Sequence, residues 1–201
     1  MMSALCQAVF NQSIADYHLQ DDVDVRAKNP YATGSPEYLL YQKNYIDTVQ
    51  WHLEDIIRNP DIEPVAALAL KRRIDSSNQE RTDLVEYIDS YFLDQYKSIK
   101  PIEGATINTE SPAWAIDRLS ILLLKIYHMQ QEVNRPGSEA EHKEACSVKL
   151  AILKQQEADL CGAIDALLHE IGEGKKYMKV YRQMKMYNDP NLNPILYATK
   201  K

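Results

Sequence analysis

The sequence contains little glycine, and it has no segment in which apolar and polar residues alternate over a useful length. Only six of its 201 residues are glycine, and a half-buried strand would require that alternation. Ala, Leu, Glu, Lys and Gln fill long segments instead, and these residue types favour helix. The composition therefore predicts an all-α protein, and residues 1–201 are long enough to form a single domain with its own core.

Cysteines are also few, and nothing in their spacing indicates a disulfide framework or a zinc site. Cys146 and Cys161 lie on one predicted helix, too far apart to bond each other, and Cys6 is far away in the sequence. Unpaired thiols favour a reducing cytoplasm. The first residues lack the regions of a signal peptide, and no apolar run approaches about 18 residues. We therefore expect a cytoplasmic protein without a membrane span.

The net charge of −6 argues against a general nucleic-acid partner. The charge is uneven, because from Gly174 onward seven Lys and Arg residues stand against one Asp. Tyr and Met residues share one side of a predicted basic amphipathic helix at about 175–187. We expect the segment 172–201 to lie on the bundle as a strap and tail, with an anionic partner as the alternative.

Serine, proline and glycine mark where helices begin and end. Ser35 and Ser111 each precede a proline, which combines an N-cap with a favourable first-turn residue. Together with apolar residues at helical spacing, these signals predict an elongated antiparallel bundle. The five long helices are expected at about 3–19, 36–58, 64–98, 112–134 and 138–172, with the short basic amphipathic helix after them.

Arg81 falls inside the apolar stripe of the third predicted helix, on the same side as Ile74 and Ile88. A guanidinium that leaves water needs a partner, because its desolvation costs several kcal/mol. Glu157 interrupts the apolar stripe of the fifth predicted helix at a similar height, so an Arg81–Glu157 contact is one prediction. An anionic ligand is the other, and the sequence leaves both open.

Polar and aromatic residues form stripes on three of the predicted helices. If these stripes face one another, they form a polar cleft between helices in which arginines hold an anionic small molecule and two tryptophans form the walls. If they do not, they pack against other helices as internal ion pairs. The predicted ligand-binding residues are Arg81, Asn78, Asn44, Asp47, Trp51, Asp55, Arg58, Trp114, Asp117, Arg118 and Lys125.

No motif for a nucleophile or a phosphate-binding loop is present. The best candidates for a general acid or base are His128 and Asp117, because they share one helical stripe with Arg118 and Lys125. A lone helical histidine is more often a hydrogen-bonded spectator, so a catalytic role is one of two interpretations.

The sequence predicts no metal site and no cofactor. Di-iron bundles need two Glu-x-x-His motifs and two further glutamates. The only partial match is Glu139-Ala-Glu-His142, in the first turn of a helix. Acidic pairs within 80–89 match half of a magnesium motif, but they project away from the apolar stripe and are more typical of a solvated face.

Three segments resemble a known family. They are IDTVQWHLEDIIR at 46–58, IDRLSILLLKIYH at 116–128 and KVYRQMKMYNDP at 179–190. Together they are similar to a bacterial family catalogued as domain of unknown function 4254. The resemblance covers almost the whole chain and implies a single-domain cytoplasmic bacterial protein. It supplies no activity and no catalytic residues.

Three functions therefore remain open from the sequence. The first is a binding or accessory protein with a polar cleft for an anionic small molecule. The second is an enzyme that acts on a nucleotide or phosphosugar. The third is an oligomerising helical scaffold, in which the polar stripes are subunit contacts of a homodimer.

Overall fold

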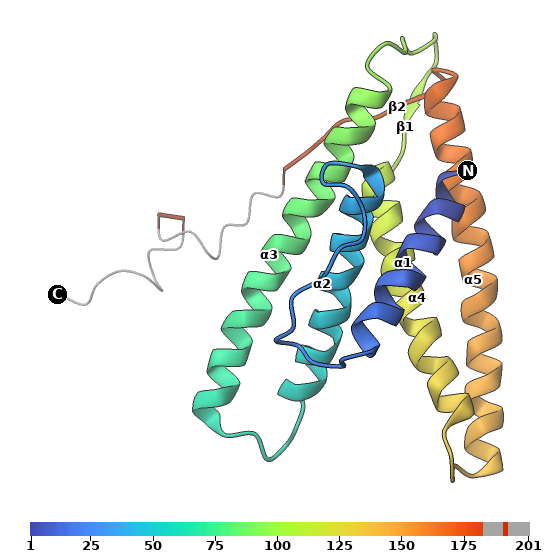
Figure 1. Cartoon of the computed structure of the whole chain (residues 1–201). Helices are drawn as coiled ribbons and strands as arrows, with labels where there is room; N and C mark the ends of the chain where they lie inside the picture. The colour runs from blue at the N-terminus through green and yellow to red at the C-terminus, as the bar shows by residue number, and fades with distance from the viewer. Residues whose placement is uncertain (183–190, 193–201) are drawn as a thin grey trace.

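The computed structural model describes residues 1–182 and 191–192, and within them the chain is a bundle of helices (Figure 1). The helices are α1 (Met2–His18), α2 (Pro36–Ile57), α3 (Pro64–Gln95), α4 (Pro112–Asn134) and α5 (Ala140–Gly172). Two short strands, β1 (Thr106–Ile107) and β2 (Lys176–Tyr177), are the other regular elements of the described residues. The predicted all-α class is confirmed.

The predicted starts of α2 and α4 are confirmed by their caps. Ser35 accepts a hydrogen bond from the backbone N–H of Tyr38, and Ser111 accepts one from Trp114 N–H. In both helices the following proline occupies the first turn, where its missing N–H leaves no helical bond unmade. These caps fix the entry points of the two helices that carry most of the functional candidates.

The helices form two antiparallel hairpins with α1 packed between them. α2 pairs with α3 and α4 pairs with α5, while α1 contacts α2, α4 and α5. Figure 1 shows the two hairpins diverging toward the ends where α2 joins α3 and α4 joins α5. The core is built on apolar side chains of α1, α2 and α4 that are almost fully excluded from water, among them Phe10, Ile14, Leu40, Tyr41, Ile116, Leu119 and Leu124.

The predicted basic helix at 175–187 is wrong over its described part. Lys176 and Tyr177 instead form β2, which pairs in parallel with Thr106 and Ile107 of β1, and residues 178–182 are not helical. Gly174 makes this change of direction at φ 73°, so close to Lys100 that a Cβ would lie 2.7 Å from its carbonyl oxygen. The chain thus leaves α5 in an extended conformation; residues 183–187 of the prediction lie outside the described residues.

None of the helices in the described part of the chain is both long enough and apolar enough to cross a membrane. This agrees with the expectation from the sequence. α3 and α5 are the longest helices, and each carries charged residues along its whole length.

Candidate functional site

Arg81 lies in a buried ion cluster of four charged side chains from three helices. Its guanidinium donates to both carboxylate oxygens of Asp117, with Nη2 at 3.0 and 2.7 Å from Oδ1 and Oδ2, and its Nε lies 3.0 Å from Asp47 Oδ1. Lys43, which has no exposed surface, donates to Asp47 and lies 2.8 Å from Asp117 Oδ1. Two cations therefore meet two anions, and we call Lys43, Asp47, Arg81 and Asp117 the ion cluster.

The electrostatics of the ion cluster follow from burial and pairing. At Asp117, burial acts to raise the pKa, but Lys43 and Arg81 outweigh it, so the pKa lies below its ordinary value. At Asp47, burial is the larger effect and the pKa is raised despite the attraction of Lys43. Ser120 donates to Asp47 and accepts from Asn44 within the same interior. The ion cluster is balanced in charge without any external ligand.

The predicted contact between Arg81 and Glu157 is wrong. Glu157 instead accepts a hydrogen bond of 2.7 Å from the side-chain amide of Gln7 on α1. The reason is neighbour order, because α3 packs against α2 and α4 and makes no contact with α5. Helical periodicity placed both residues correctly on inward faces, but it does not specify which helices are neighbours.

Part of the predicted ligand-binding set lines one cavity. A cavity of about 380 Å³ beside Arg81 is bordered by Trp51, Asp55 and Arg58 of α2 and by Asp47. Arg58 is largely exposed and pairs with Glu54 of its own helix. From α3, Arg81 alone borders this cavity, and both of its cations, Arg58 and Arg81, already have anionic partners.

Other residues of the predicted set lie elsewhere or serve the packing of helices. Asn78 accepts a hydrogen bond from Gln50, which ties α3 to α2, and Asn44 donates to Ser120 on α4. Trp114 borders a different cavity near β1 and β2. Arg118 is exposed and pairs with Glu110, and it lines neither the cavity beside Arg81 nor the one beside His128.

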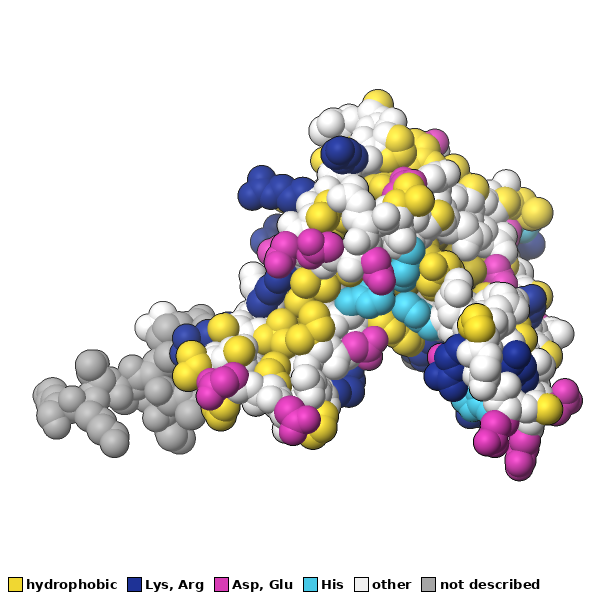
Figure 2. All heavy atoms as spheres, turned by 60° about the horizontal axis from the view of Figure 1, so that its bottom comes forward, with side chains coloured by type: hydrophobic (Ala, Val, Ile, Leu, Met, Phe, Trp, Pro, Cys, Tyr) yellow, Lys and Arg dark blue, Asp and Glu magenta, His cyan; other side chains and the backbone are white. Residues whose placement is uncertain are grey.

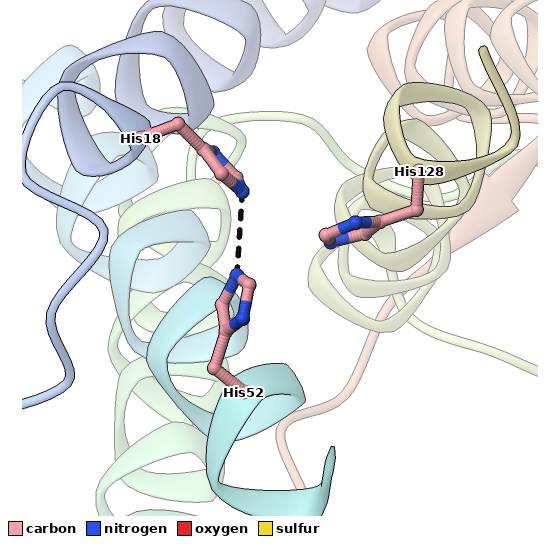
Figure 3. Close-up of side chains that lie close together, drawn as sticks. All are labelled: His18, His52 and His128. Atoms are coloured by element: carbon pink, nitrogen blue, oxygen red, sulfur yellow. Dashed lines mark hydrogen bonds between the residues drawn. The ribbon is translucent and has the colours of Figure 1, made fainter. Parts of the chain in front are cut away.

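A second polar cluster consists of three histidines from three helices, His18 of α1, His52 of α2 and His128 of α4. One ring nitrogen of each lies within 4.8 Å of the others. All three side chains are partly buried, and Figure 3 shows the imidazoles pointing toward a common centre. In the space-filling view, histidine side chains meet in the recess between the diverging hairpin ends (Figure 2). We call these three residues the histidine cluster.

Two of the imidazoles have the separation that a shared metal ion requires. His18 Nδ1 lies 2.7 Å from the carbonyl oxygen of Ile14, which can only accept, so this nitrogen carries the proton and Nε2 is left with a lone pair. His18 Nε2 is 3.3 Å from His52 Nε2. Tetrahedral Zn–N bonds of about 2.0–2.1 Å place two nitrogens about 3.3–3.4 Å apart. A direct N–H···N hydrogen bond has a similar length, so the third imidazole decides between the two arrangements.

The third imidazole, His128, has no partner for its inner nitrogen. Its Nε2 is buried and makes no hydrogen bond within the described residues, although buried imidazole nitrogens are normally satisfied. The ring stacks on Trp51 with centroids 4.7 Å apart, which fixes its orientation. Burial, followed by the neighbouring His52 and His18, lowers the pKa of His128 to about 4. At neutral pH the ring is therefore uncharged, which is the form that binds a metal.

One carboxylate stands beside the histidine cluster. Asp21 Oδ1 lies 3.9 Å from His52 Nε2, and its side chain is 64% exposed. Asp21 is also the one residue other than glycine that has a positive φ in the described chain, at 50°. This conformation follows the end of α1, where Asp21 N–H donates to the Tyr17 carbonyl. The turn directs an acidic group to the solvent side of the cluster, where it can hold a proton or a water molecule.

The histidine cluster has the donor set of a transition-metal centre. Imidazole nitrogen suits Zn²⁺, Cu²⁺, Fe²⁺ and Ni²⁺, and three protein ligands leave a coordination position open for water or substrate. A second group, Glu132 with His142 and Cys146, also has its ligand atoms within 4.8 Å of one another. There, however, His142 and Glu132 already pair at 2.9 Å and both contact Arg135, and this nearby cation disfavours a metal ion.

Sequence reasoning considered His52 and His128 as acid–base candidates and favoured His128, but it did not group them with His18 or predict a metal site. The three residues lie on separate helices, and successive members are 34 and 76 positions apart in the sequence, so no spacing motif connects them. One signal was present: His18, His52 and His128 all lie near the carboxyl ends of helices that run in the same direction (Figure 1). A fold with correct neighbours is needed before that signal becomes a site.

Comparison with known proteins gives a family and no activity. A family model described as a protein of unknown function (DUF4254) matches residues 37–180, which include α2, α3, α4 and α5. No curated protein and no solved structure matches the chain. Two of the three histidines, His52 and His128, lie inside the matched region, and His18 lies before it.

Proposed function

Since this chain belongs to the family of proteins of unknown function DUF4254, whose description assigns no activity, we propose a function from the site itself. The chain binds one divalent transition-metal ion, Zn²⁺ as the reference metal, through His18, His52 and His128. The observation that carries this proposal is the convergence of three imidazole nitrogens within 4.8 Å, in a cluster where the buried Nε2 of His128 has no hydrogen-bond partner in the described residues.

The surroundings of the histidine cluster support a metal ion over a plain imidazole contact. The hydrogen bond from His18 Nδ1 to Ile14 is the outer contact that orients metal-binding histidines in proteins. His18 is also the last residue of α1, and helix carboxyl ends favour cations. Three imidazoles packed together gain little from one another, whereas each would gain a strong bond from a shared ion.

The chemistry that such a centre supplies is activation of water. An ion with three histidine ligands would keep one coordination position open for water, and a zinc-bound water has a pKa of about 7. Asp21, 3.9 Å from His52 Nε2, is placed to accept a hydrogen bond from that water. The reaction class we propose is therefore metal-assisted hydrolysis or hydration of a substrate that reaches the open position.

Metal binding is tested with chelator-treated protein and Co²⁺, whose visible spectrum reports its ligands. We expect one Co²⁺ per chain in a tetrahedral-type spectrum without a thiolate charge-transfer band, and displacement by Zn²⁺. His52→Ala and His128→Phe should weaken binding by more than about 100-fold, because loss of outer-sphere partners alone costs about 10–100-fold. His142→Ala is the matched control and should bind normally.

Two results would contradict the proposal. One is the absence of stoichiometric Co²⁺ binding at pH 7 in the folded protein. The other is a spectrum with a thiolate band that His142→Ala abolishes and His128→Phe leaves intact, because that result would place the ion at Glu132, His142 and Cys146.

The anionic small-molecule ligand expected from the sequence remains a proposal, with different residues in support. Arg81 borders a cavity, but Asp47 and Asp117 neutralise its charge. Lys125, another member of the predicted set, borders a cavity that also includes His128. An anion beside the histidine cluster is therefore better supported than an anion at Arg81.

The remaining alternatives have less support. A general-base role for Asp117 requires a free carboxylate, and both of its oxygens are engaged by Arg81. A homodimeric scaffold stays a prediction that light scattering tests, and so does an enzyme of nucleotides or phosphosugars, which a turnover assay tests.

A further inference from the structure

An apolar groove opens directly beside the histidine cluster. It has a volume of about 410 Å³, within the range of small-molecule sites. Trp51 and His128, which stack on each other, form its inner end. Met129 of α4 and Ile152 of α5 extend it along the second hairpin. Any molecule in this groove would touch the same imidazole that faces the proposed metal ion.

The walls of the groove leave apolar surface in water. Ile152 is 54% exposed, although it borders the same groove as Trp51 and Leu153. Apolar side chains that are gathered in a concave surface gain free energy when another apolar body covers them, at about 25 cal/mol per Å². The groove therefore favours a ligand with an apolar part.

Two lysines at the groove have no anionic partner. Lys125 and Lys149 border it, both are exposed, and neither makes a hydrogen bond or an ion pair in the part of the chain that the structure describes. The single acid of the groove, Glu132, is already paired with Arg135 at 3.2 Å and with His142 at 2.9 Å. The groove consequently presents a net positive charge next to its apolar surface.

We infer that the groove binds a small amphiphilic anion, with its apolar chain against Trp51 and Ile152 and its carboxylate or phosphate head group on Lys125 and Lys149. Charge complementarity and the limited volume favour a small molecule over a protein partner. That this molecule is the substrate of the metal centre rests on the proposed function, whereas its binding to the groove does not.

The experiment measures binding of octanoate and of octyl phosphate by calorimetry, with and without Zn²⁺. Both anions should bind the metal-free protein, while n-octanol, which keeps the chain, and acetate, which keeps the head group, should bind at least about tenfold more weakly. The ratio of the two anion affinities tells which head group the lysines prefer.

Variants locate the binding site. The double change of Lys125→Gln and Lys149→Gln should weaken octanoate at least about tenfold, and Ile152→Ser should weaken it by loss of apolar contact. Lys154→Gln, on the same helix but outside the groove, is the matched control and should bind as the unchanged protein does. His52→Ala removes a proposed metal ligand that does not border the groove, so it should still bind octanoate.

Each outcome decides the inference separately from the metal proposal. Binding by the metal-free protein and by His52→Ala supports the groove even if no metal ion binds. Binding only with Zn²⁺, and unchanged by the lysine variants, places the head group on the metal and overturns the inference. The absence of octanoate binding with and without Zn²⁺ also overturns the inference. So does an octanoate affinity that falls as the protein concentration rises, because a second copy of the chain would then occupy the groove.

Discussion

The ion cluster and the histidine cluster are both polar groups where three helices meet, but only the ion cluster has its charges balanced within the chain. In the ion cluster Lys43 and Arg81 face Asp47 and Asp117. Asp47 Oδ1 makes no hydrogen bond in the described residues, but it lies 3.0 Å from the charged Nε of Arg81. In the histidine cluster three like groups face one another, and the buried nitrogen of His128 has no partner in the described residues.

This difference distinguishes a structural polar cluster from one that indicates a ligand. Buried polarity alone does not indicate a ligand, because a charge-balanced network fixes the register of helices and needs no further partner. A cluster of like groups with one shared affinity does, since folding would otherwise bury lone pairs without compensation. We therefore infer a structural role for the ion cluster and propose a binding role for the histidine cluster.

The largest expected effect is on stability, from breaking the ion cluster. Asp117→Asn leaves Lys43 and Arg81 with one anion, and loss of one partner in a buried ion pair costs about 3–5 kcal/mol. Urea unfolding should show this loss. Arg118→Ala, at the position after Asp117, breaks the exposed ion pair with Glu110. This change should cost less than about 1 kcal/mol. An equal loss in the free energy of unfolding for the two variants would contradict the structural role of the ion cluster.

The second effect concerns ligand-linked stability. At a free Zn²⁺ concentration of 100 times its Kd, the ion should add about 2.7 kcal/mol, which is about 5–10 °C in melting temperature for a domain of this size. His128→Phe should abolish this shift. Asp117→Asn should retain it on a lower baseline, and a loss of the shift in that variant would show that the two clusters are not independent.

The third effect is the pH dependence of the metal-free protein. The pKa of His128 is about 4 in the folded chain against 6.5 for an ordinary histidine, so between these values only the unfolded chain takes up the proton. Stability should therefore fall as the pH is lowered from 6.5 toward 4. The pKa of Asp117 is lowered below 3.8, so its contribution is lost only under more acidic conditions.

Urea unfolding at several pH values tests this order. His128→Phe should reduce the slope of stability between pH 6.5 and 4, because the variant has one imidazole fewer to protonate. A slope that stays the same in His128→Phe would mean that another group controls the acid response.

The smallest effect separates the backbone role of Asp21 from its charge. Ala in the left-handed conformation costs about 1–2 kcal/mol, whereas Asn tolerates it. Asp21→Ala should therefore destabilise the metal-free protein by about 1 kcal/mol, and Asp21→Asn should not. In the Co²⁺ form both variants should change the pH dependence of the spectrum alike, because both lose the carboxylate. A change confined to Asp21→Ala would assign the effect to the turn alone.

The fold was largely predictable, because helix starts and ends are local. Ser35 and Ser111 cap their helices from within the same turn, and such signals are readable without tertiary structure. The segment after Gly174 was not, because its strand depends on Thr106 and Ile107, about 70 residues earlier. A segment that mixes lysine, tyrosine and methionine is compatible with both an amphipathic helix and an extended strand. Pairing with β1 selects the strand.

The site was predictable only in part, for a related reason. Periodicity showed that Arg81 is inward-facing and needs a partner, and it placed Asp47 and Asp117 on polar stripes of other helices that would form a cleft or pack against neighbouring helices. Which of them meet depends on helix order and rotation, and that information is in the packing of whole helix faces. The histidine cluster depends entirely on this packing, since no residues close to His18 or His52 in the sequence mark either one as part of a site.

The divergence of the two hairpins (Figure 1) gives the histidine cluster a mechanical role as well. His52 belongs to one hairpin, His128 to the other, and His18 to the helix between them. An ion bound by all three residues would link the two hairpins across the open end of the bundle. Metal binding would then limit how far the ends of the hairpins can separate. Amide hydrogen exchange near the carboxyl ends of α2 and α4 would slow when the ion binds.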